Sequence, residues 1–557
     1  MKPTHSPNSR RDLLLIGRFL RILEPRDRMK PSAADMRRRA REVLEEARAE
    51  GTLEHLVRQL VLATGLDAFL PDAYRRFQPA VLEGMVFLLT RMTPARLGRK
   101  IVEQLRLPPS ADPGRRLLVL IKDMPTLQKL GQVIARNPRL DPRFRASLVD
   151  LEDNLHTMTY AHLRRLAEKQ VKAAACRGRI MPQRRILSEA SVCAVVPARV
   201  EPATGPSMDA VLKFVKPRVR RTLKAELRLL DSVAEFMEGC KEAWGLSGFR
   251  FREILQEARG VVEREVDLIS EQKNLAEARS HYASNRGLLV PAVLKVSTPF
   301  MTVMAREEGR KITDVGHLDA GERRRLAQAL VDTCILAPVR ELRGTGIFHG
   351  DPHAGNLAYR FSNGKPVLIL YDWAVMGRLN RLEQFAFILL TLGLILGNAE
   401  AVFYAGDMIT GGQLTAEPDR ERVFRDIVRK TLAERTGRLK GILASVEALF
   451  EAFTYEGVVF SADLMMYKKA LFTLQGVLAE VDPTFDRDAY LVRAAAAAFL
   501  DDLFRIRLRP VMREIWSLYR RSFMLFFRIQ KVILRFLVEV TLFWARLPGK
   551  WLAARRQ

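Results

Sequence analysis

One stretch, from residue 349 to residue 372, constrains what this chain can fold into more than any other part of the sequence. It reads His349-Gly-Asp-Pro-His-Ala-Gly-Asn356, and an apolar run, Val367-Leu-Ile-Leu-Tyr, then ends at Asp372. Transfer of a phosphoryl group needs a carboxylate to orient the attacking oxygen and further oxygen ligands to hold magnesium on the phosphates. We therefore predict Asp351 as the catalytic carboxylate. Asn356 and Asp372 are predicted as ligands of Mg²⁺, with ATP as the second cofactor.

The order of these residues is that of the catalytic loop and the D-F-G element of protein kinases. It predicts an α+β, two-lobed protein-kinase-like fold with a small β-containing lobe and a helical large lobe. The alternative is an Asx-rich turn in which Asp351 and Asn356 only cap neighbouring elements. Any one of the three residues alone would favour that turn, but together at this spacing they favour phosphate chemistry. Small-molecule phosphotransferases share the H-G-D loop, so the motif does not choose between the two classes of enzyme.

Composition narrows the possible partners. The 557 residues are 48% hydrophobic and 28% charged, as in a globular protein, and the formal net charge is +27. Nucleic acid and an anionic membrane are the two obvious partners for such a charge. The sequence has no zinc-finger spacing and no aromatic RNA-binding strand motif, which argues against nucleic acid. The cysteines form no C-x-x-C pair, which argues against a disulfide framework or a zinc site and fits a reducing compartment; they are Cys176, Cys193, Cys240 and Cys334.

The apolar patterns predict five regions along the chain. These are a helical N-terminal extension (1–115), a second helical segment (116–180), the small lobe with an inserted helix (181–305), the large lobe (306–515) and a tail (516–557). Within the lobes we expect the following elements: strands at Ile186–Val196 and Ala210–Val215, a long helix at Gly248–His281, a second strand pair at 291–296 and 300–304, and a loop-rich stretch at 344–379.

Short motifs upstream of the catalytic loop carry a more specific resemblance. They are Lys129-Leu-Gly-Gln132, Ala190-Ser-Val-Cys-Ala194, Val211-Leu-Lys213, and Glu265-Val-Asp267 followed by Glu271 and Asn274. In this order and spacing, across about residues 116–400, the sequence resembles the UbiB/AarF family of atypical kinases. That family has a K-x-G-Q helix before the small lobe, an alanine-rich loop in place of the glycine-rich one, and an E-x-D motif on the inserted helix.

The resemblance implies roles for the matching residues. Lys213 looks like the strand lysine that contacts the phosphates, and its compact ammonium suits phosphate oxygens. Ala190, Ser191 and Val192 would form the nucleotide loop. The remaining matches are regulatory positions: Lys129, Gln132, Glu265, Asp267 and Glu271. Residues two apart point about 160° away from each other on a helix, so spacing leaves open which acid pairs with Lys213 and which with Lys129. Without the downstream loop, Lys213 would be interpreted as a strand lysine that extends to solvent.

The resemblance also implies an ATPase acting on a quinone or other isoprenoid lipid in ubiquinone biosynthesis. Lys129 and Gln132 match the pair that occludes the peptide site in this family, so the phosphorylation of large proteins is not expected. A membrane-bound biosynthetic complex is a further partner implied, and the expected location is the cytoplasmic side of a bacterial inner membrane.

Three positions depart from the family pattern. The D-F-G element reads Asp372-Trp373-Ala374, and alanine disfavours the positive φ that glycine allows. Glu189 stands where relatives carry small apolar residues, and its carboxylate could meet phosphates. Ala194 replaces the usual glutamine. These changes keep a second hypothesis open, namely a pseudokinase scaffold that binds nucleotide with little turnover.

The tail, residues 516–557, predicts an amphipathic helix. Its charged residues fall within a narrow arc at 100° per residue; they are Arg521, Arg528, Lys531, Arg535, Glu539 and Arg546. A basic stripe opposite a broad apolar face is typical of a helix that lies in the plane of a membrane surface. The alternative is a helix docked on the catalytic body or on a second subunit.

Overall fold

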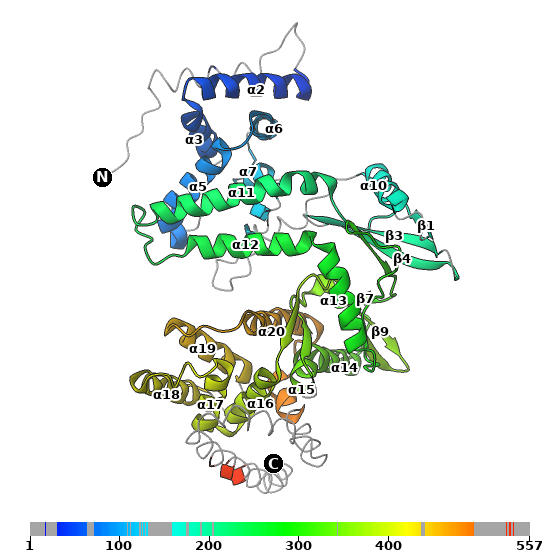
Figure 1. Ribbon diagram of the computed structural model, residues 1–557, viewed down its shortest axis with the longest axis vertical. Helices are drawn as coiled ribbons and strands as arrows, with labels where there is room; N and C mark the ends of the chain where they lie inside the picture. Colours follow the sequence, from blue (N-terminus) through cyan, green and yellow to red (C-terminus); the bar gives the residue numbers. More distant parts are fainter. Residues whose placement is uncertain are drawn as a thin grey trace. The chain divides into compact units, whose positions relative to one another are not determined.

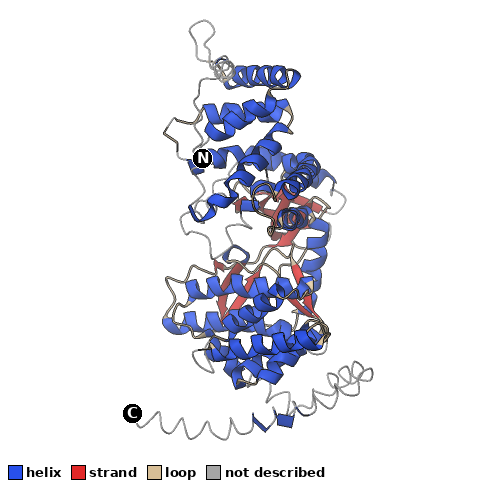
Figure 2. Ribbon diagram, turned by 90° about the vertical axis from the view of Figure 1, so that its left-hand side faces the viewer, coloured by secondary structure: helices blue, strands red, loops and turns tan. Residues whose placement is uncertain are grey.

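The computed structural model describes most of the chain, in two compact units. The described residues are 17, 31–63, 72–108, 110–111, 113–121, 124, 126–128, 130–131, 159–173, 178–189, 192–202, 205–341, 344–435, 441–494, 531, 534–535 and 538–539. Unit 1 spans Met1–Ile269 and Leu294–Met304, and unit 2 spans Ser270–Val293 and Ala305–Gln557. Helix is the dominant element in each unit (Figure 2). The five sequence regions stay predictions.

Unit 1 combines a helical layer with a small antiparallel sheet (Figure 1). Its helices are α2 (Ala33–Ala49), α3 (Leu53–Ala63), η1 (Asp72–Phe77), α5 (Gln78–Thr90), α6 (Pro94–Leu105), α7 (Pro113–Ile121), α10 (Tyr160–Ala173), α11 (Pro217–Cys240) and α12 (Phe251–Val266). Its strands are β1 (Gly178–Pro182), β2 (Ser188–Glu189), β3 (Cys193–Pro202), β4 (Met208–Val215) and β6 (Met301–Ala305). The apolar faces of α2, α3, α5 and α6 share one core with α11, because each helix carries buried residues at helical spacing.

The sheet of unit 1 runs in the order β1-β3-β4-β6, with β2 paired to β3. The strand predicted to end at Val196 in fact continues through Pro197 to Pro202. The N–H that Pro197 lacks would point to the same side of β3 as its carbonyl, which accepts from the Gln183 N–H just beyond the end of β1. The β1–β3 ladder has already ended there, so proline is tolerated at this position.

Two other element predictions were wrong in detail. The single helix predicted at Gly248–His281 is two helices, because α12 ends at Val266 and α13 (Leu268–His281) begins after Asp267, whose φ of −85° and ψ of 74° are not helical. Residues 291–296 form no strand. Leu294 bonds to Val303 of β6, but Ser297 closes a turn on Leu294, which stops the extended ladder.

Unit 2 is mostly helical around two small sheets. Its helices are α13, α14 (Ala320–Val331), the π-helical turn η3 (Asp332–Leu336), α15 (Ala337–Arg340), η4 (Ala354–Asn356), α16 (Arg381–Leu396), α17 (Ala399–Ile409), α18 (Pro418–Ala433), α19 (Ile442–Tyr455) and α20 (Ala462–Val481). Its strands are β5 (Leu288–Leu289), β7 (Arg310–Lys311), β8 (Gly346–His349), β9 (Leu357–Ser362), β10 (Lys365–Leu370) and β11 (Met376–Leu379).

The stretch 344–379 is therefore richer in strand than the sequence predicted. β9 and β10 form a hairpin, and β8 pairs antiparallel with β11. These two pairs hold the segment between residues 349 and 376, where the predicted catalytic residues lie, against one large hydrophobic core.

Candidate phosphate and magnesium site

The predicted catalytic loop begins where β8 ends, and Gly350 allows its close packing. The Gly350 N–H donates to the Val375 carbonyl at 2.9 Å. A Cβ at residue 350 would lie 2.6 Å from Val375 Cγ1 and 2.7 Å from the Met466 sulfur, and such contacts are too short for any side chain. Glycine at this position thus lets the loop lie against the chain that follows Asp372 and against α20.

His349 joins the two halves of the site. Its Nδ1 accepts from the Asp351 N–H at 3.1 Å, and its Nε2 lies 2.8 Å from the Tyr371 carbonyl. A carbonyl can only accept, so Nε2 carries the proton and the ring is the neutral tautomer. Burial lowers the pKa of His349, which agrees with this neutral form. The imidazole therefore fixes the backbone of Asp351 relative to the residue before Asp372.

Asn356 makes a second connection between the same two segments. Its side-chain Nδ2 donates to the Asp351 carbonyl at 3.2 Å, and its own carbonyl accepts from the Tyr371 N–H at 2.9 Å. The amide uses its nitrogen inside the loop, so its oxygen is the atom of that group suited to a cation. Asp351, Asn356 and Asp372 thus belong to two segments that are bonded directly to each other.

Asp372 has a left-handed backbone, with φ of 53°. Asparagine and aspartate tolerate this region better than most residues, although it still costs on the order of 1 kcal/mol. Trp373 follows and is fully buried, with its ring 5.0 Å from that of His349. Among the described residues, Asn363 and Asp372 are the non-glycine residues with positive φ, so Ala374 needs no glycine-like angle.

Helix α13 supports this segment from the side. Asn274 Nδ2 donates to the Trp373 carbonyl at 2.9 Å. Glu271 lies one helical turn earlier, on the same face of α13, and is buried. The predicted regulatory residue Glu271 is therefore carried by the helix that holds the Asp372 segment.

Two further predicted site residues, Lys213 and Val192, lie in or next to the sheet of unit 1. Lys213 lies in β4, buried, opposite Val195 of β3. Val192 packs with Cys193 and Val215 in a small apolar cluster beside the end of α12. Glu189 is buried, and its carboxylate lies 2.7 Å from the Lys216 ammonium. The negative charge that was expected to face phosphates is thus already neutralised inside the unit.

The E-x-D motif does not lie on one helix as the sequence predicted. Glu265 is in the last turn of α12, and its carbonyl is 3.5 Å from the Cys193 sulfur. Asp267 lies in the break before α13 and is exposed. The angle of about 160° expected for two acids on one helix therefore does not apply to Glu265 and Asp267. Glu265 does lie next to Cys193, the first residue of β3.

Four predicted residues lie outside the described part of the chain: Lys129, Gln132, Ala190 and Ser191. The tail is represented there by residues 531, 534–535 and 538–539 alone, so the predicted amphipathic helix is also outside it. Within the described residues, no group of three His, Cys, Asp or Glu side chains could hold a metal. The predicted magnesium ligands are an aspartate and an asparagine, which with phosphate oxygens form the hard donor set that magnesium prefers.

Sequence reasoning assigned no role to His349, Asn274 or Lys216. His349 was part of the motif, and its position two residues before Asp351 was the available signal. Lys216 could have been found from Glu189, because a buried acid in a loop that binds phosphates requires a nearby cation. Only the register of β2, β3 and β4 identifies which cation it is.

Comparison with known proteins identifies the domain. A family model described as the ABC1 atypical kinase-like domain matches residues 150–405. That range contains the loop from His349 to Asp372, together with Lys213 and Glu271. The chain carries an ABC1 atypical kinase-like domain. The two-lobed α+β kinase-like fold predicted from the sequence is thereby confirmed.

The relatives of this ABC1 domain support the resemblance to the UbiB/AarF family. A protein of Xanthomonas campestris pv. campestris named "Probable protein kinase UbiB" is 25% identical over 416 residues, which is 71% of each chain. A chloroplast protein of Arabidopsis thaliana, named ACTIVITY OF BC1 COMPLEX KINASE 7, is 24% identical over 65% of this chain and 51% of its own. A solved structure of Rv3197 with erythromycin from Mycobacterium tuberculosis covers 66% of this chain and 91% of its own, with 16% identity and a TM-score of 0.42. The resemblance stated from the motifs is confirmed by the family model and by several relatives that bear the UbiB name.

Proposed function

We propose that this chain is an ATP- and magnesium-dependent enzyme that hydrolyses ATP or transfers its terminal phosphoryl group. The observation that carries the proposal is the direct bonding of two segments, one with Asp351 and Asn356 and the other with Asp372, through His349 and the Asn356 backbone. Because neutral hydrogen bonds hold the backbone that carries these three oxygen-bearing side chains, the segments form a preorganised site for a cationic metal and an attacking hydroxyl or water.

Each residue then has a role that its chemistry supports. Asp351 orients the attacking oxygen and takes up its proton, while the ammonium of Lys213 binds phosphate oxygens as a point charge. Asn356 and Asp372 would hold Mg²⁺, which when bound neutralises charge on the phosphates. His349 stays neutral and positions Asp351, because both of its ring nitrogens are already used in hydrogen bonds.

The acceptor and the location belong to the same proposal. The UbiB-like motifs support an isoprenoid or quinone lipid as the substrate, handled at the cytoplasmic face of a membrane, with a membrane-bound biosynthetic complex as partner. The basic, apolar tail and the net charge of +27 support contact with an anionic surface. Among the described residues, no helix combines the length and apolar character that are needed to cross a bilayer.

The observations that favoured a pseudokinase scaffold are weaker in the structure than in the sequence. Ala374 does not need a positive φ, and Glu189 is paired with Lys216 and so presents no uncompensated charge. The departures from the family pattern therefore leave the polar frame around Asp351 intact, and we favour the enzyme.

The test is ATP turnover by the purified full chain, with and without anionic liposomes, beside the Asp372→Asn variant. The proposal expects magnesium-dependent turnover in the wild type and its loss in the variant, because the amide removes the anionic metal ligand. Tight binding of Mg-ATP without hydrolysis in any lipid would instead favour the scaffold.

A further inference from the structure

Tyr282, the residue that follows helix α13, lies against both segments of the predicted site. Its hydroxyl donates a hydrogen bond to the Ile347 carbonyl in β8, two residues before His349. The centre of its ring is 6.3 Å from that of Trp373, the residue after Asp372. Tyr282 is buried, and burial raises the pKa of its hydroxyl, which therefore keeps the proton that it donates. One buried side chain thus connects the strand that leads into the catalytic loop with the segment that holds the predicted metal ligand.

The Ile347 carbonyl is a group that the strand ladder leaves without a donor. Gly350 donates to Val375 across the register of β8 and β11, so alternate residues of β8, counted back from Gly350, direct their backbone groups to β11. Ile347 is out of phase with Gly350, and its carbonyl therefore points to the opposite edge of β8. In the described part of the chain, β8 and β11 form a sheet of two strands. A buried carbonyl on such an edge needs a donor from elsewhere, and the Tyr282 hydroxyl supplies one.

Helix α13 is thereby bonded to both segments of the site. Asn274 anchors the segment that contains Asp372, by its bond to the carbonyl of the next residue. Tyr282 anchors β8, and the imidazole of His349 at the end of β8 accepts from the Asp351 N–H at 3.1 Å. The position of the Asp351 backbone relative to the Asp372 segment therefore depends on α13 as well as on His349.

We infer that Tyr282 is a positioning residue for phosphoryl transfer, which holds Asp351 at its working distance from the metal-binding segment. This rests on the proposed function, which gives Asp351 the task of orienting the attacking oxygen. Without the hydroxyl, β8 loses its bond to α13, while a phenylalanine ring keeps the packing beside Trp373. A misplacement of about 1 Å can lower a rate by about a hundredfold. Tyr282 does not contact Lys213, so its hydroxyl should affect turnover more than nucleotide affinity.

The experiment compares Tyr282→Phe with the wild type in the full chain. The kcat and the KM for ATP are measured at saturating Mg²⁺, well below the melting temperature of each protein, and Mg-ATP binding by calorimetry checks that the variant is folded. The kcat should fall by about tenfold, and the KM and the binding affinity should stay within about twofold of the wild type. A purely structural role would lower the melting temperature without this selective loss of kcat.

The matched control is Tyr467, a second buried tyrosine of unit 2. Its hydroxyl also donates to a backbone carbonyl, that of Ile335 in η3, at 2.7 Å. Tyr467→Phe removes the same chemical group, but the carbonyl that loses its donor lies outside the two site segments. This variant should lower the melting temperature about as much as Tyr282→Phe does and keep kcat within about twofold of the wild type.

The double variant Asn274→Ala with Tyr282→Phe tests the part played by α13. The helix joins the two segments only while both bonds are present, so the double variant should lose less kcat than the product of the two single losses. An unchanged kcat in Tyr282→Phe, an equal fall in Tyr467→Phe, a rise in KM alone, or single losses that multiply would each overturn the inference. A wild type without magnesium-dependent turnover would refute the proposed function itself, and the inference with it.

Discussion

Asp372 and its neighbours show how single residues decide the geometry of this site. The left-handed backbone is at Asp372 itself, with φ of 53°, and not at Ala374, which replaces the glycine of the D-F-G pattern. Strain of this kind is tolerated where surrounding contacts hold it, and here Asn274 and the buried ring of Trp373 do so. The loss of glycine from the D-F-G pattern therefore has little effect on the local conformation.

Replacing Ala374 by glycine tests this interpretation. Because Ala374 needs no special backbone angle, Ala374→Gly should destabilise the protein by about 0.4–1 kcal/mol through added freedom of the unfolded chain. ATP turnover should stay within about twofold of the wild type, since none of the polar contacts changes. A large gain in turnover would show that alanine had been restricting the site.

Replacement of Asn274 should lower ATP turnover and the melting temperature more than replacement of an exposed neighbour on α13. In Asn274→Ala the Trp373 carbonyl loses its donor, and a partly buried group left unsatisfied costs about 1–3 kcal/mol. We expect lower ATP turnover together with a lower melting temperature. Lys273→Ala, one residue earlier and exposed, is the control and should change neither. Equal turnover and melting temperature in the two variants would show that Asn274 does not support the Asp372 segment.

The residue identities of the catalytic loop were predictable, but its connections were not. Asp351, Asn356 and Asp372 follow from order and spacing alone. The double role of His349 depends on β8 pairing with β11, which brings residue 349 beside residue 376. The partner of Glu189 depends on strand register in the same way, and neither pairing leaves a local signal in the sequence.

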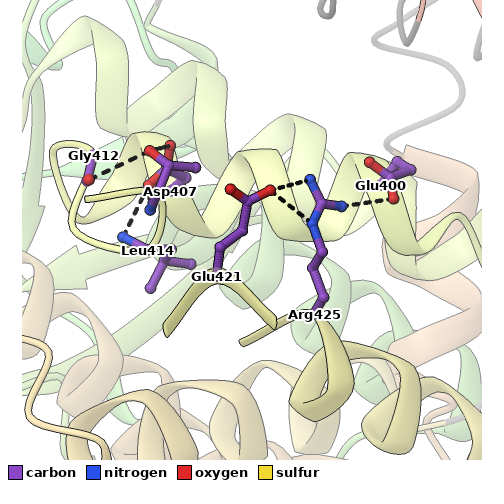
Figure 3. A network of polar contacts seen from close by, with 7 residues as sticks. Glu400, Asp407, Gly412, Leu414, Glu421 and Arg425 are labelled. Atoms are coloured by element: carbon purple, nitrogen blue, oxygen red, sulfur yellow. Dashed lines mark hydrogen bonds and ion pairs between the residues drawn. The ribbon is translucent and has the colours of Figure 1, made fainter. Parts of the chain in front are cut away.

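At the scale of elements, polar contacts organise the turn between α17 and α18 (Figure 3). Asp407 accepts from the N–H groups of Leu414 and Thr415 at 3.0 and 3.1 Å, and from the Thr415 hydroxyl at 3.0 Å. Arg425 of α18 bridges Glu400 and Glu421 at 2.7 and 2.8 Å. A turn held by one buried carboxylate sets the path from α17 into α18.

Asp407→Ala should therefore destabilise the protein more than a surface change would. Each buried donor left without its acceptor costs about 1–3 kcal/mol, whereas loss of the exposed Asp426–Arg429 pair should cost less than about 1 kcal/mol. Denaturant unfolding of Asp407→Ala and Asp426→Ala measures the difference. Similar losses would mean that the turn is not held by Asp407.

The same carboxylate predicts a pH dependence. Burial raises the pKa of Asp407 above its ordinary 3.8, even though Thr415 and Leu414 donate to it. The stability that this shift contributes is present below pH 3.8 and is lost as the pH rises through the raised pKa. The amide of an Asp407→Asn variant does not titrate, so the wild type should lose stability relative to the variant from pH 3.8 upward. Denaturant unfolding of both proteins across this window measures the difference, and a wild type that gains on the variant contradicts the prediction.

The helical break at Asp267 illustrates what hydrophobic periodicity misses. The apolar pattern runs from 248 to 281 without a proline, so the sequence predicted one helix. In the structure Asp267 leaves the helical region, and α13 begins afresh and carries Glu271 and Asn274. Because of the break, the two acids of the E-x-D motif do not lie on one helix. The helical period of the sequence does not reveal this.

At the scale of the whole molecule, the net charge and the tail predict binding to anionic membranes. The net charge of +27 favours an anionic surface, and attraction to anionic lipid contributes about 1 kcal/mol for each basic residue near the surface. Removal of residues 516–557 should therefore release the protein from anionic liposomes in a sedimentation assay, while binding by the full chain should weaken as salt rises. Unchanged sedimentation of the shortened chain would refute anchoring by the tail.

The central claim is that Asp351, Asn356 and Asp372 form a site for a magnesium–nucleotide complex, and equilibrium binding tests it most directly. Titration of the full chain with ATP, in the presence and absence of Mg²⁺, should show affinity that depends on the metal in the wild type. This metal dependence should be lost in Asp372→Asn, but it should be kept in the control Asp314→Asn, whose carboxylate is exposed and lies beside Arg310. A folded wild type without affinity for Mg-ATP, or an Asp372→Asn variant that keeps the full metal dependence, would contradict the account.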